Sequence, residues 1–571
     1  MSSKFRVIGN GVPYLDGAED ELLSFIKSTV DRSIGSDELA LGIHDWPTLY
    51  HFSQARANLL LPFSIGSEHR VLDVGCGTGA LTRQFAEWGA NVTGLEGSHA
   101  RCLVANERVN EFENAEIVKG SLDEYLNESH NEEFDVILLC GVLEYSGAIF
   151  GGSSGPDKML NGINRLLKPD GIVIIAIENQ LGMKYLLGHN EDHLGVPWVG
   201  LSDYHLNNSG IRTWTRSALE NLLSKNGLSE SRWYGSFPDY KLPSAVISDA
   251  LWELEDGKQL ARQFIRNPIT GTSAGPQFLS DPLAFWDLIL QTESPKDFVN
   301  SHLVVASKSK LEGSSFLRDG LIWTGHGSRK KKFSTRATLR ANLNGLEYVH
   351  EHRVEEVVIE GALRQKRNQV AVVVGENMED WIISQSRDKT LVEISEVLKV
   401  WWDEALTVLN ANAHGGTNFD VLPRNFIRDP KSESWIFIDD EWTWHEPISS
   451  SLILLRCLFS LFQERFNFLG IPKISENKSL VETIYELAEL LTGNKIDVDV
   501  NKFVSFEARI VAKVSSVIDV GREERLLELL NINLSKLQVN PNAFRLHEIN
   551  IELNQELYFL RNLVRNLKNS L

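Results

Sequence analysis

Residues 70–96, RVLDVGCGTGALTRQFAEWGANVTGLE, carry the pattern that decides the fold. An apolar run ends at Asp73 and turns through three glycines, and a helical pattern then leads to a second apolar run that closes on Glu96. Strand, glycine turn, helix, strand and acid form the βαβ unit that binds an adenosine-containing cofactor. A carboxylate at the end of the second strand can accept hydrogen bonds from both ribose hydroxyls of such a ligand.

The glycine spacing separates this turn from two other nucleotide-binding turns. A dinucleotide site needs G-x-G-x-x-G and a P-loop needs a lysine, but residues 73–79, DVGCGTG, supply neither. The carboxylate of Asp73, where a pyrophosphate would lie, suits a cationic or zwitterionic ligand. The stretch resembles motif I of the class I S-adenosylmethionine (SAM) methyltransferases, which implies SAM as the cofactor. The alternative is a glycine-rich turn that binds nothing.

Three later pieces follow in the order of that family. A strand at 115–119 precedes Gly120-Ser121-Leu122-Asp123, where a backbone N–H and a side chain can contact the adenine edge. A strand at 134–140 leads into GVLEY, which matches motif IV, where the strand end faces the methyl donor. The turn LKPDG at 167–171 is common in this fold. The resemblance implies SAM contacts from Asp73, Gly75, Cys76, Gly77, Gly79, Glu96, Ser121, Leu122 and Cys140.

The same resemblance implies an α/β fold with a Rossmann-like, seven-stranded methyltransferase sheet. We expect this domain to span residues 1–310, with a helical insertion at about 244–300. A chain of 571 residues is too long for one core, since domains average ~150 residues. We therefore predict a mainly helical second domain at 311–540 and a terminal helix at 541–571.

Charge and cysteine content restrict the protein class. A net charge of −20 argues against a nucleic-acid binder, which would present a basic face. The four cysteines show no C-x-x-C spacing, so neither a zinc site nor a disulfide framework is indicated. The first residues lack the apolar core of a signal peptide, and no apolar run is long enough for a transmembrane segment. We expect a cytoplasmic protein.

Residues 178–195, 212–216 and 237–243 together resemble methyltransferases of bacterial O-antigen and related surface-glycan synthesis. This resemblance implies a glycan or nucleotide-sugar substrate and methylation of a sugar hydroxyl. A hydroxyl needs a general base, and His193, oriented by Asp192, meets that need. Two alternatives stay open for this cluster: a polar loop held together for structure, and a metal site, for which the sequence offers no second ligand cluster.

The second half contains HGGTNFDVLPRNFIRDPKSESWIFIDDEW at 414–442. The spacing of Asp420, Asn425 and Asp439 resembles the C-terminal lobe of kinase-like phosphotransferases. The resemblance implies Mg-ATP, with Asp420 as the catalytic-loop acid and with Asn425 and Asp439 as Mg²⁺ ligands. Two departures weaken it: Asn418 replaces a usual histidine, and no G-x-G-x-x-G loop precedes the segment. A degenerate kinase-like module and an unrelated helical domain are the alternatives.

Periodicity predicts further helices in the second half. Residues 338–350 and 391–412 follow a helical pattern, and the apolar positions from 546 to 571 alternate in steps of three and four, as in a coiled-coil seam. Such a helix would form an oligomer or bind glycan-synthesis enzymes, or dock on the protein's own surface. The predicted function is SAM-dependent O-methylation. The alternatives are Mg-ATP-dependent phosphotransfer and a SAM-binding scaffold that acts through the terminal helix.

Overall fold

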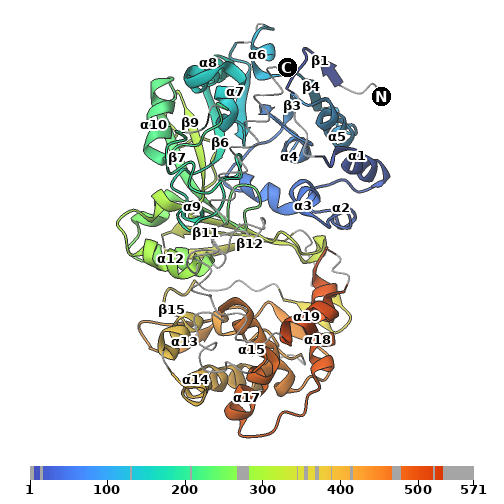
Figure 1. Cartoon of the computed structure of the whole chain (residues 1–571), viewed down its shortest axis with the longest axis vertical. Helices are drawn as coiled ribbons and strands as arrows, with labels where there is room; N and C mark the ends of the chain where they lie inside the picture. Colours follow the sequence, from blue (N-terminus) through green and yellow to red (C-terminus); the bar gives the residue numbers. More distant parts are fainter. Residues whose placement is uncertain are drawn as a thin grey trace, which may run out of the picture.

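A computed structural model describes most of the chain: residues 5–12, 17–128, 131–205, 207, 209–265, 282–343, 345–352, 358–366, 372–387, 389–411, 416–465, 478–517 and 521–531. A large sheet with helices on both faces fills the upper part of Figure 1. A mainly helical unit lies below it, beyond the hairpin β11–β12. The helix predicted at 541–571 lies outside the described residues.

The sheet has twelve strands in the order β1-β4-β3-β2-β5-β6-β9-β7-β8-β10-β11-β12. Strands β2 to β6 run parallel to one another, and β9 lies between β6 and β7 and is antiparallel to both. The predicted Rossmann-like arrangement is therefore present, and its seven strands form the middle of the larger, twelve-stranded sheet. These seven are β4 (Ala115–Lys119), β3 (Asn91–Glu96), β2 (Arg70–Val74), β5 (Phe134–Cys140), β6 (Leu167–Glu178), β9 (Ser301–Ser307) and β7 (Glu230–Phe237).

Five more strands extend the sheet at its two edges. At one edge β1 pairs parallel with β4, and at the other edge the remaining four strands continue antiparallel from β7. The domain boundary expected at residue 310 falls inside this continuous sheet, between β9 and β10. The added strands are β1 (Phe5–Val7), β8 (Ala245–Ser248), β10 (Ile322–Gly325), β11 (Thr335–Asn342) and β12 (Gly345–His352).

The helix predicted at residues 338–350 was wrong, because this segment forms the hairpin β11–β12. Leu339 lies opposite Tyr348, and the two strands pair in register from Thr335–His352 to Asn342–Gly345. Pairing with β10 satisfies the backbone of β11 as part of the sheet and buries alternate side chains at the start of this strand. Tertiary context thus overrode the local helical pattern.

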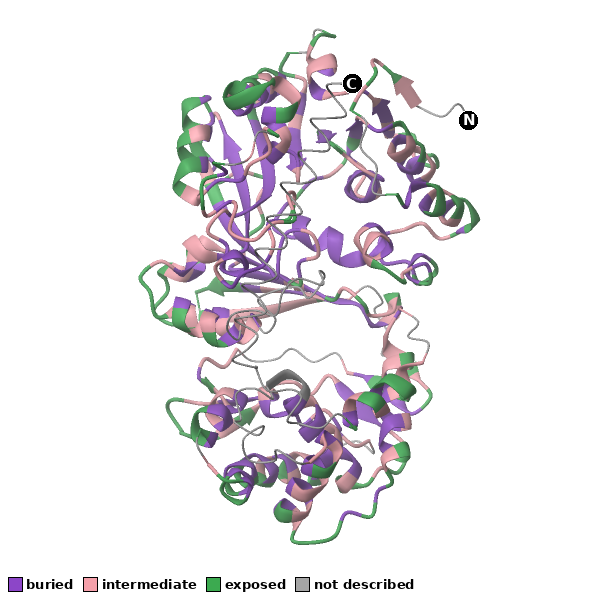
Figure 2. Cartoon of the chain, viewed as in Figure 1, coloured by how far each residue is buried: buried purple, intermediate pink, exposed green. Residues whose placement is uncertain are grey.

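Apolar side chains cover both faces of the central sheet. Successive residues of a strand point to opposite faces, so Val71 and Leu138 belong to one buried cluster while Leu72 and Ile137 belong to the other. The purple strands of Figure 2 lie between these two layers. The helices of this upper part are α1 (Glu19–Ser28), α2 (Asp37–Ala40), α3 (Trp46–Phe52), α4 (Ala80–Glu87), α5 (His99–Val109), α6 (Leu122–Leu126), α7 (Ser146–Phe150), α8 (Gly155–Leu166), α9 (Met183–Leu186), α10 (Arg216–Lys225), α11 (Gly257–Phe264) and α12 (Pro282–Leu290).

The lower unit has a hydrophobic core of its own, which includes Trp401, Leu454 and Leu487. The helix predicted at 391–412 is confirmed as α14 (Leu391–Asn410), which Thr390 caps. Among the described helices, none has the length and apolar character needed to cross a bilayer. The other elements are α13 (Met378–Ser386), α15 (Ser450–Arg465), α17 (Leu480–Thr492), α18 (Val500–Val514), α19 (Arg522–Leu530) and two small sheets, β13 (Val358–Glu360), β14 (Leu363–Gln365), β18 (Trp442–Trp444) and β15 (Glu376–Asn377), β16 (Phe426–Arg428), β17 (Trp435–Phe437).

Candidate functional site

The glycine turn between β2 and α4 leaves open space at the carboxyl end of the sheet. Gly75, Gly77 and Gly79 all have positive φ, a conformation that favours glycine. A Cβ at Gly75 would lie 2.6 Å from Val142, whereas a Cβ at Gly77 would meet nothing within 4 Å. The turn is therefore anchored to the loop after β5 at its first glycine and open at its second, where a ligand could approach the backbone.

Two acids flank this turn at the ends of neighbouring strands. Asp73 is buried and accepts a hydrogen bond from Thr82 Oγ1 at 2.6 Å. Burial raises the pKa of Asp73 to about 7. Glu96 Oε2 accepts from the backbone N–H of Gly77 at 2.9 Å, and Glu96 Oε1 accepts from the backbone N–H of Ser98 at 2.8 Å. The structure brings the predicted ribose acid directly onto the glycine turn.

The remaining predicted cofactor residues lie on the adjoining strand ends. Cys76 is half-buried, and its N–H donates to the carbonyl of Leu95 at 3.0 Å. Ser121 precedes α6, where its N–H donates to Glu124 Oε2 at 2.8 Å. Leu122 is buried in the apolar layer, so its side chain is part of the core. Cys140 ends β5 and is half-buried.

The segment that precedes β2 lies against this end of the sheet. Arg56 is buried in the 3₁₀ helix Gln54–Leu60, with its guanidinium 4.2 Å from the centre of the Tyr50 ring. It donates to the carbonyl of Lys241 at 3.1 Å and lies 3.8 Å from Cys140 Sγ. Residues 50–56 therefore connect the end of β5 to the loop after β7.

A cluster of charged side chains surrounds His193. The ring atom Nε2 lies 3.1 Å from Glu178 Oε2 and 3.7 Å from Glu144 Oε1, and Nδ1 lies 3.0 Å from the hydroxyl of Tyr145. Glu178 is the last residue of β6, and Glu144 and Tyr145 lie in the short 3₁₀ helix Leu143–Tyr145 that follows β5. The predicted candidate His193 thus lies beside the loop after β5 whose sequence matches motif IV.

Asp192 has different partners from those expected. Its Oδ2 accepts from Lys184 Nζ and, at 2.7 Å, from the hydroxyl of Tyr185. Its Oδ1 lies 3.3 Å from Lys241 Nζ, and the same lysine lies 2.7 Å from Glu178 Oε1. Asp192 therefore reaches the ring of His193 through Lys241 and Glu178.

Burial and charge shift the pKa values in this cluster in opposite directions. Burial, together with Glu178, raises the pKa of Glu144 to about 8. Burial alone would lower the pKa of His193, but Glu178 and Glu144 raise it to about 9. Burial alone would raise the pKa of Glu178, but Lys241 and His193 hold it below its usual range. Perturbed pKa values of this kind are typical of functional sites.

Sequence reasoning missed Glu144, Glu178 and Lys241 as site residues. Glu178 ends a strand of the central sheet, and Glu144 and Lys241 lie in the loops that follow two others, where α/β proteins place their sites. Position at a strand end was the available signal, but it did not show which of these residues face one another.

Comparison with known proteins agrees with this geometry. Residues 72–175 match the family model described as a methyltransferase domain. The chain contains a class I SAM-dependent methyltransferase domain. The ubiquinone biosynthesis O-methyltransferase of Maricaulis maris is 30% identical over 169 residues, which are 28% of this chain and 62% of that protein. The Salmonella paratyphi A protein of the same name is 32% identical over 119 residues, which are 21% of this chain and 46% of that protein.

The chain thus spans about half to two thirds of the length of these curated relatives. Among solved structures, Haemonchus contortus phosphoethanolamine N-methyltransferase 2 in complex with S-adenosyl-L-methionine is 20% identical. The match covers 51% of this chain and 58% of that one, with a TM-score of 0.28. The expectation of a SAM-dependent methyltransferase domain is confirmed by the family match, whereas the individual SAM contacts stay predictions.

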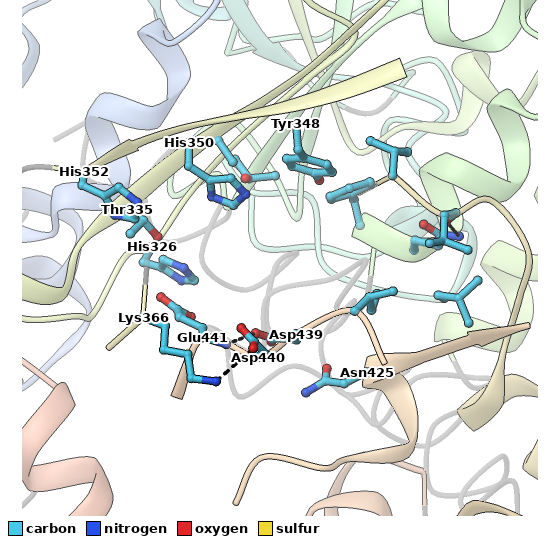
Figure 3. Close-up of a pocket in the computed structure, with 18 of the residues that line it drawn as sticks. His326, Thr335, Tyr348, His350, His352, Lys366, Asn425, Asp439, Asp440 and Glu441 are labelled. Carbon is cyan, nitrogen blue, oxygen red and sulfur yellow. Dashed lines mark hydrogen bonds and ion pairs between the residues drawn. The ribbon is translucent and has the colours of Figure 1, made fainter. Parts of the chain in front are cut away.

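A second candidate site lies between the methyltransferase domain and the lower unit. A pocket of about 290 Å³ has strands β10–β12 on one side and the segment Ile438–Glu441 on the other. Figure 3 shows Asn425 and Asp439 at its lower edge, facing His350 and Tyr348 of β12. The pocket therefore gathers two of the three predicted phosphotransfer residues.

The charged groups around this pocket are arranged in pairs. Lys366 Nζ donates to Asp440 Oδ2 at 2.9 Å (Figure 3), and Arg329 holds both oxygens of Glu441 at 2.6 and 3.0 Å. Burial, together with nearby carboxylates, raises the pKa of Asp439 to about 6.

Asp420, the third predicted residue, stands beside Asn425, whose Nδ2 donates to the Asp420 carbonyl at 2.8 Å. Asp420 Oδ1 accepts from Arg456 Nη1 at 2.6 Å. Burial alone would raise the pKa of Asp420, but Arg456 keeps it below its usual range.

Proposed function

We propose that this protein is a SAM-dependent O-methyltransferase whose acceptor is a sugar hydroxyl of a glycan or nucleotide sugar. Support for methyl transfer comes from the match at residues 72–175 and from the placing of Glu96 against the glycine turn. In this reaction the sulfonium gives its methyl group to the acceptor oxygen. The C–S bond breaks as the C–O bond forms, and the hydroxyl proton must pass to a base.

The observation that carries the choice of a hydroxyl acceptor is the cluster around His193. It places an imidazole and two carboxylates beside motif IV, at the end of β5 and β6. We assign the hydroxyl proton to the neutral form of His193, whose population increases as the pH rises toward its pKa of about 9. We assign Asp192 a positioning role through Lys241 and Glu178. Because the sulfonium is already a good leaving group, positioning of the oxygen supplies most of the rate.

The experiment follows a labelled methyl group from SAM into glycan intermediates extracted from a surface-polysaccharide-producing bacterium, with ubiquinone precursors as the comparison acceptor. We expect label in the glycan with the wild type. We expect at least about tenfold less with His193→Gln, at unchanged SAM affinity, because general bases contribute factors of about 10²–10⁴. Label only in the ubiquinone precursors would refute the glycan acceptor, and no transfer to any hydroxyl would refute O-methylation.

A second candidate is Mg-ATP-dependent phosphotransfer in the lower unit. Its support is the pocket between β10–β12 and Asn425–Asp439, because kinase-like enzymes place a nucleotide between a small sheet and these two metal-binding positions. We expect γ-labelled Mg-ATP to phosphorylate a glycan acceptor, and Asp439→Asn to abolish the transfer. Asp429→Asn, which changes an exposed turn after β16, is the matched control. Equal transfer by Asp439→Asn and wild type would exclude this function.

A further inference from the structure

We infer that Glu144, Glu178 and His193 form a binding site for a divalent cation next to the methyl-transfer end of the sheet. One ligand atom from each side chain lies within 4.8 Å of the other two. The three residues come from the loop after β5, the end of β6 and the loop after α9. The catalytic role of the ion rests on the proposed methyl transfer, whereas its binding does not.

The separations of the ligand atoms suit a shared ion. His193 Nε2 lies 3.1 Å from Glu178 Oε2 and 3.7 Å from Glu144 Oε1. Ligand atoms about 2.0–2.2 Å from an ion in tetrahedral or octahedral geometry lie about 3.0–3.5 Å from one another. Small side-chain rotations would therefore bring all three atoms to coordinating distance.

Glu144 supplies an independent sign that a ligand is needed. It is 0% exposed, and neither carboxylate oxygen accepts a hydrogen bond from any residue that the structure describes. Its ion-pair partner within the described chain is His193, whereas Lys241 pairs with Glu178 and Asp192, and Lys184 pairs with Asp192. A buried carboxylate without hydrogen bonds is costly, and a cation would satisfy it.

The surroundings already hold two of the three ligands, His193 and Glu178, in place. The Tyr145 hydroxyl at 3.0 Å can accept the Nδ1 proton of His193, which leaves Nε2 free to coordinate. Lys241 contacts Glu178 Oε1, so Oε2 is the oxygen that faces the ring. Glu191 Oε2 accepts the backbone N–H of His193 at 2.9 Å and fixes the loop. Outer contacts of this kind are typical of metal ligands.

The donor set indicates a first-row divalent ion. Carboxylates suit Mg²⁺ and Mn²⁺ and imidazole suits Zn²⁺ and neighbouring metals, so we commit to an ion of the Mn²⁺ type. Three protein ligands leave positions open for the acceptor oxygen. Coordination would lower the hydroxyl pKa, so that its proton passes to water and the oxygen attacks the methyl group. With the ion bound, His193 would be its ligand and could not also take the proton, so activation by the ion would stand in place of the base role proposed for His193.

Mn²⁺ binding, followed by the electron paramagnetic resonance signal of the free ion, tests the site. All titrations use the full chain with Asp439→Asn, which removes the other predicted metal position. We expect saturable binding that weakens at least about tenfold in Glu144→Gln and in His193→Gln. Glu133→Gln, which removes a carboxylate before the opposite end of β5, should leave the affinity unchanged. No saturable binding, or equal affinity in Glu144→Gln, would overturn the proposal.

Two further measurements distinguish failure of the metal site from failure of the proposed methyl transfer and from misfolding of a variant. SAM binding, measured on every variant, reports on folding and on the cofactor site, so a protein that binds Mn²⁺ but transfers no methyl group refutes only the proposed function. If Glu144→Gln fails to fold, the electron paramagnetic resonance spectrum of Mn²⁺ bound to protein with ¹⁵N-labelled histidine tests whether a histidine coordinates the ion. A histidine nitrogen coupling that His193→Gln removes is expected, and its absence overturns the site.

Discussion

The backbone N–H of Gly77 donates to Glu96 Oε2 across 2.9 Å, so the glycine turn is joined to the acid at the end of the next strand. Glu96→Ala removes this bond and the hydrogen-bond acceptors for a ribose. Because hydrogen bonds to a charged group contribute about 1.5–3 kcal/mol each, we expect SAM affinity to fall by about 10–100-fold, measured by calorimetry. Glu116→Gln on β4 is the control. Unimpaired binding by Glu96→Ala would show that the ribose lies elsewhere.

SAM binding should depend on pH through Asp73. Burial raises the pKa of this carboxyl to about 7, so it is half protonated near neutral pH. The ionised form attracts the positively charged cofactor and the protonated form does not. We expect SAM affinity to be constant above pH 8 and to fall up to about tenfold per unit below pH 7. Asp73→Asn should bind weakly at every pH, and a flat wild-type profile between pH 5.5 and 8 would contradict this role.

His302 should make the fold sensitive to acid. It is buried in β9 against Trp233, and burial lowers its pKa to about 3, well below the 6.5 of an exposed histidine. Only the unfolded chain takes the proton between these values, so stability is complete above pH 6.5 and is lost as pH falls. The loss is about 1.4 kcal/mol per pH unit below 6. Urea unfolding at pH 7.5 and 5 should show this slope in wild type and a smaller one in His302→Gln.

Local patterns in the sequence predicted the parts of the site that lie within one strand–helix–strand unit. Asp73 and Glu96 are 23 positions apart, and the βαβ unit alone brings them to adjacent strand ends. For the cluster around His193, the sequence predicted His193 and Asp192 but not Glu178 and Lys241. Glu178 ends β6 and Lys241 follows β7, and the two come together because β9 alone separates these strands in the sheet. This strand order depends on pairing between distant strands, which spacing along the chain does not reveal.

The hairpin β11–β12 shows why the second half was harder. Leu339 and Leu346, seven positions apart, fit a helical period, whereas Leu346 and Tyr348, two positions apart, fit an alternating one. The turn at Asn342–Gly345 was the signal that should have favoured strands. The strand with which β11 pairs is β10, which lies earlier in the chain. The local pattern of residues 338–350 does not reveal this pairing.

A fragment that ends at residue 310 should be less stable than one that ends at 352. The shorter fragment leaves the hydrogen-bonding edge of β8 unpaired and removes Trp323, which packs on Tyr234 at 5.8 Å. Loss of one buried tryptophan alone costs about 3–5 kcal/mol. We expect fragment 1–310 to aggregate or to unfold at lower urea than fragment 1–352. Equal midpoints would show that the boundary at 310 is a true domain border.

Among the charged residues of the lower unit, we expect substitution of Arg456 to lower the free energy of unfolding the most. It lies 2.6 Å from Asp420 Oδ1 and 3.0 Å from Glu507 Oε1, and all three side chains are largely buried. Arg456→Met leaves two buried carboxylates without this cation, and breaking such a pair costs about 3–5 kcal/mol. Tryptophan fluorescence during urea unfolding should report this loss, and adding Asp420→Asn should recover part of it. Arg509→Met, which breaks the exposed pair with Glu446, should lower the free energy of unfolding by less than about 1 kcal/mol. A similar loss in both variants would mean that Arg456 does not stabilise the buried carboxylates of Asp420 and Glu507.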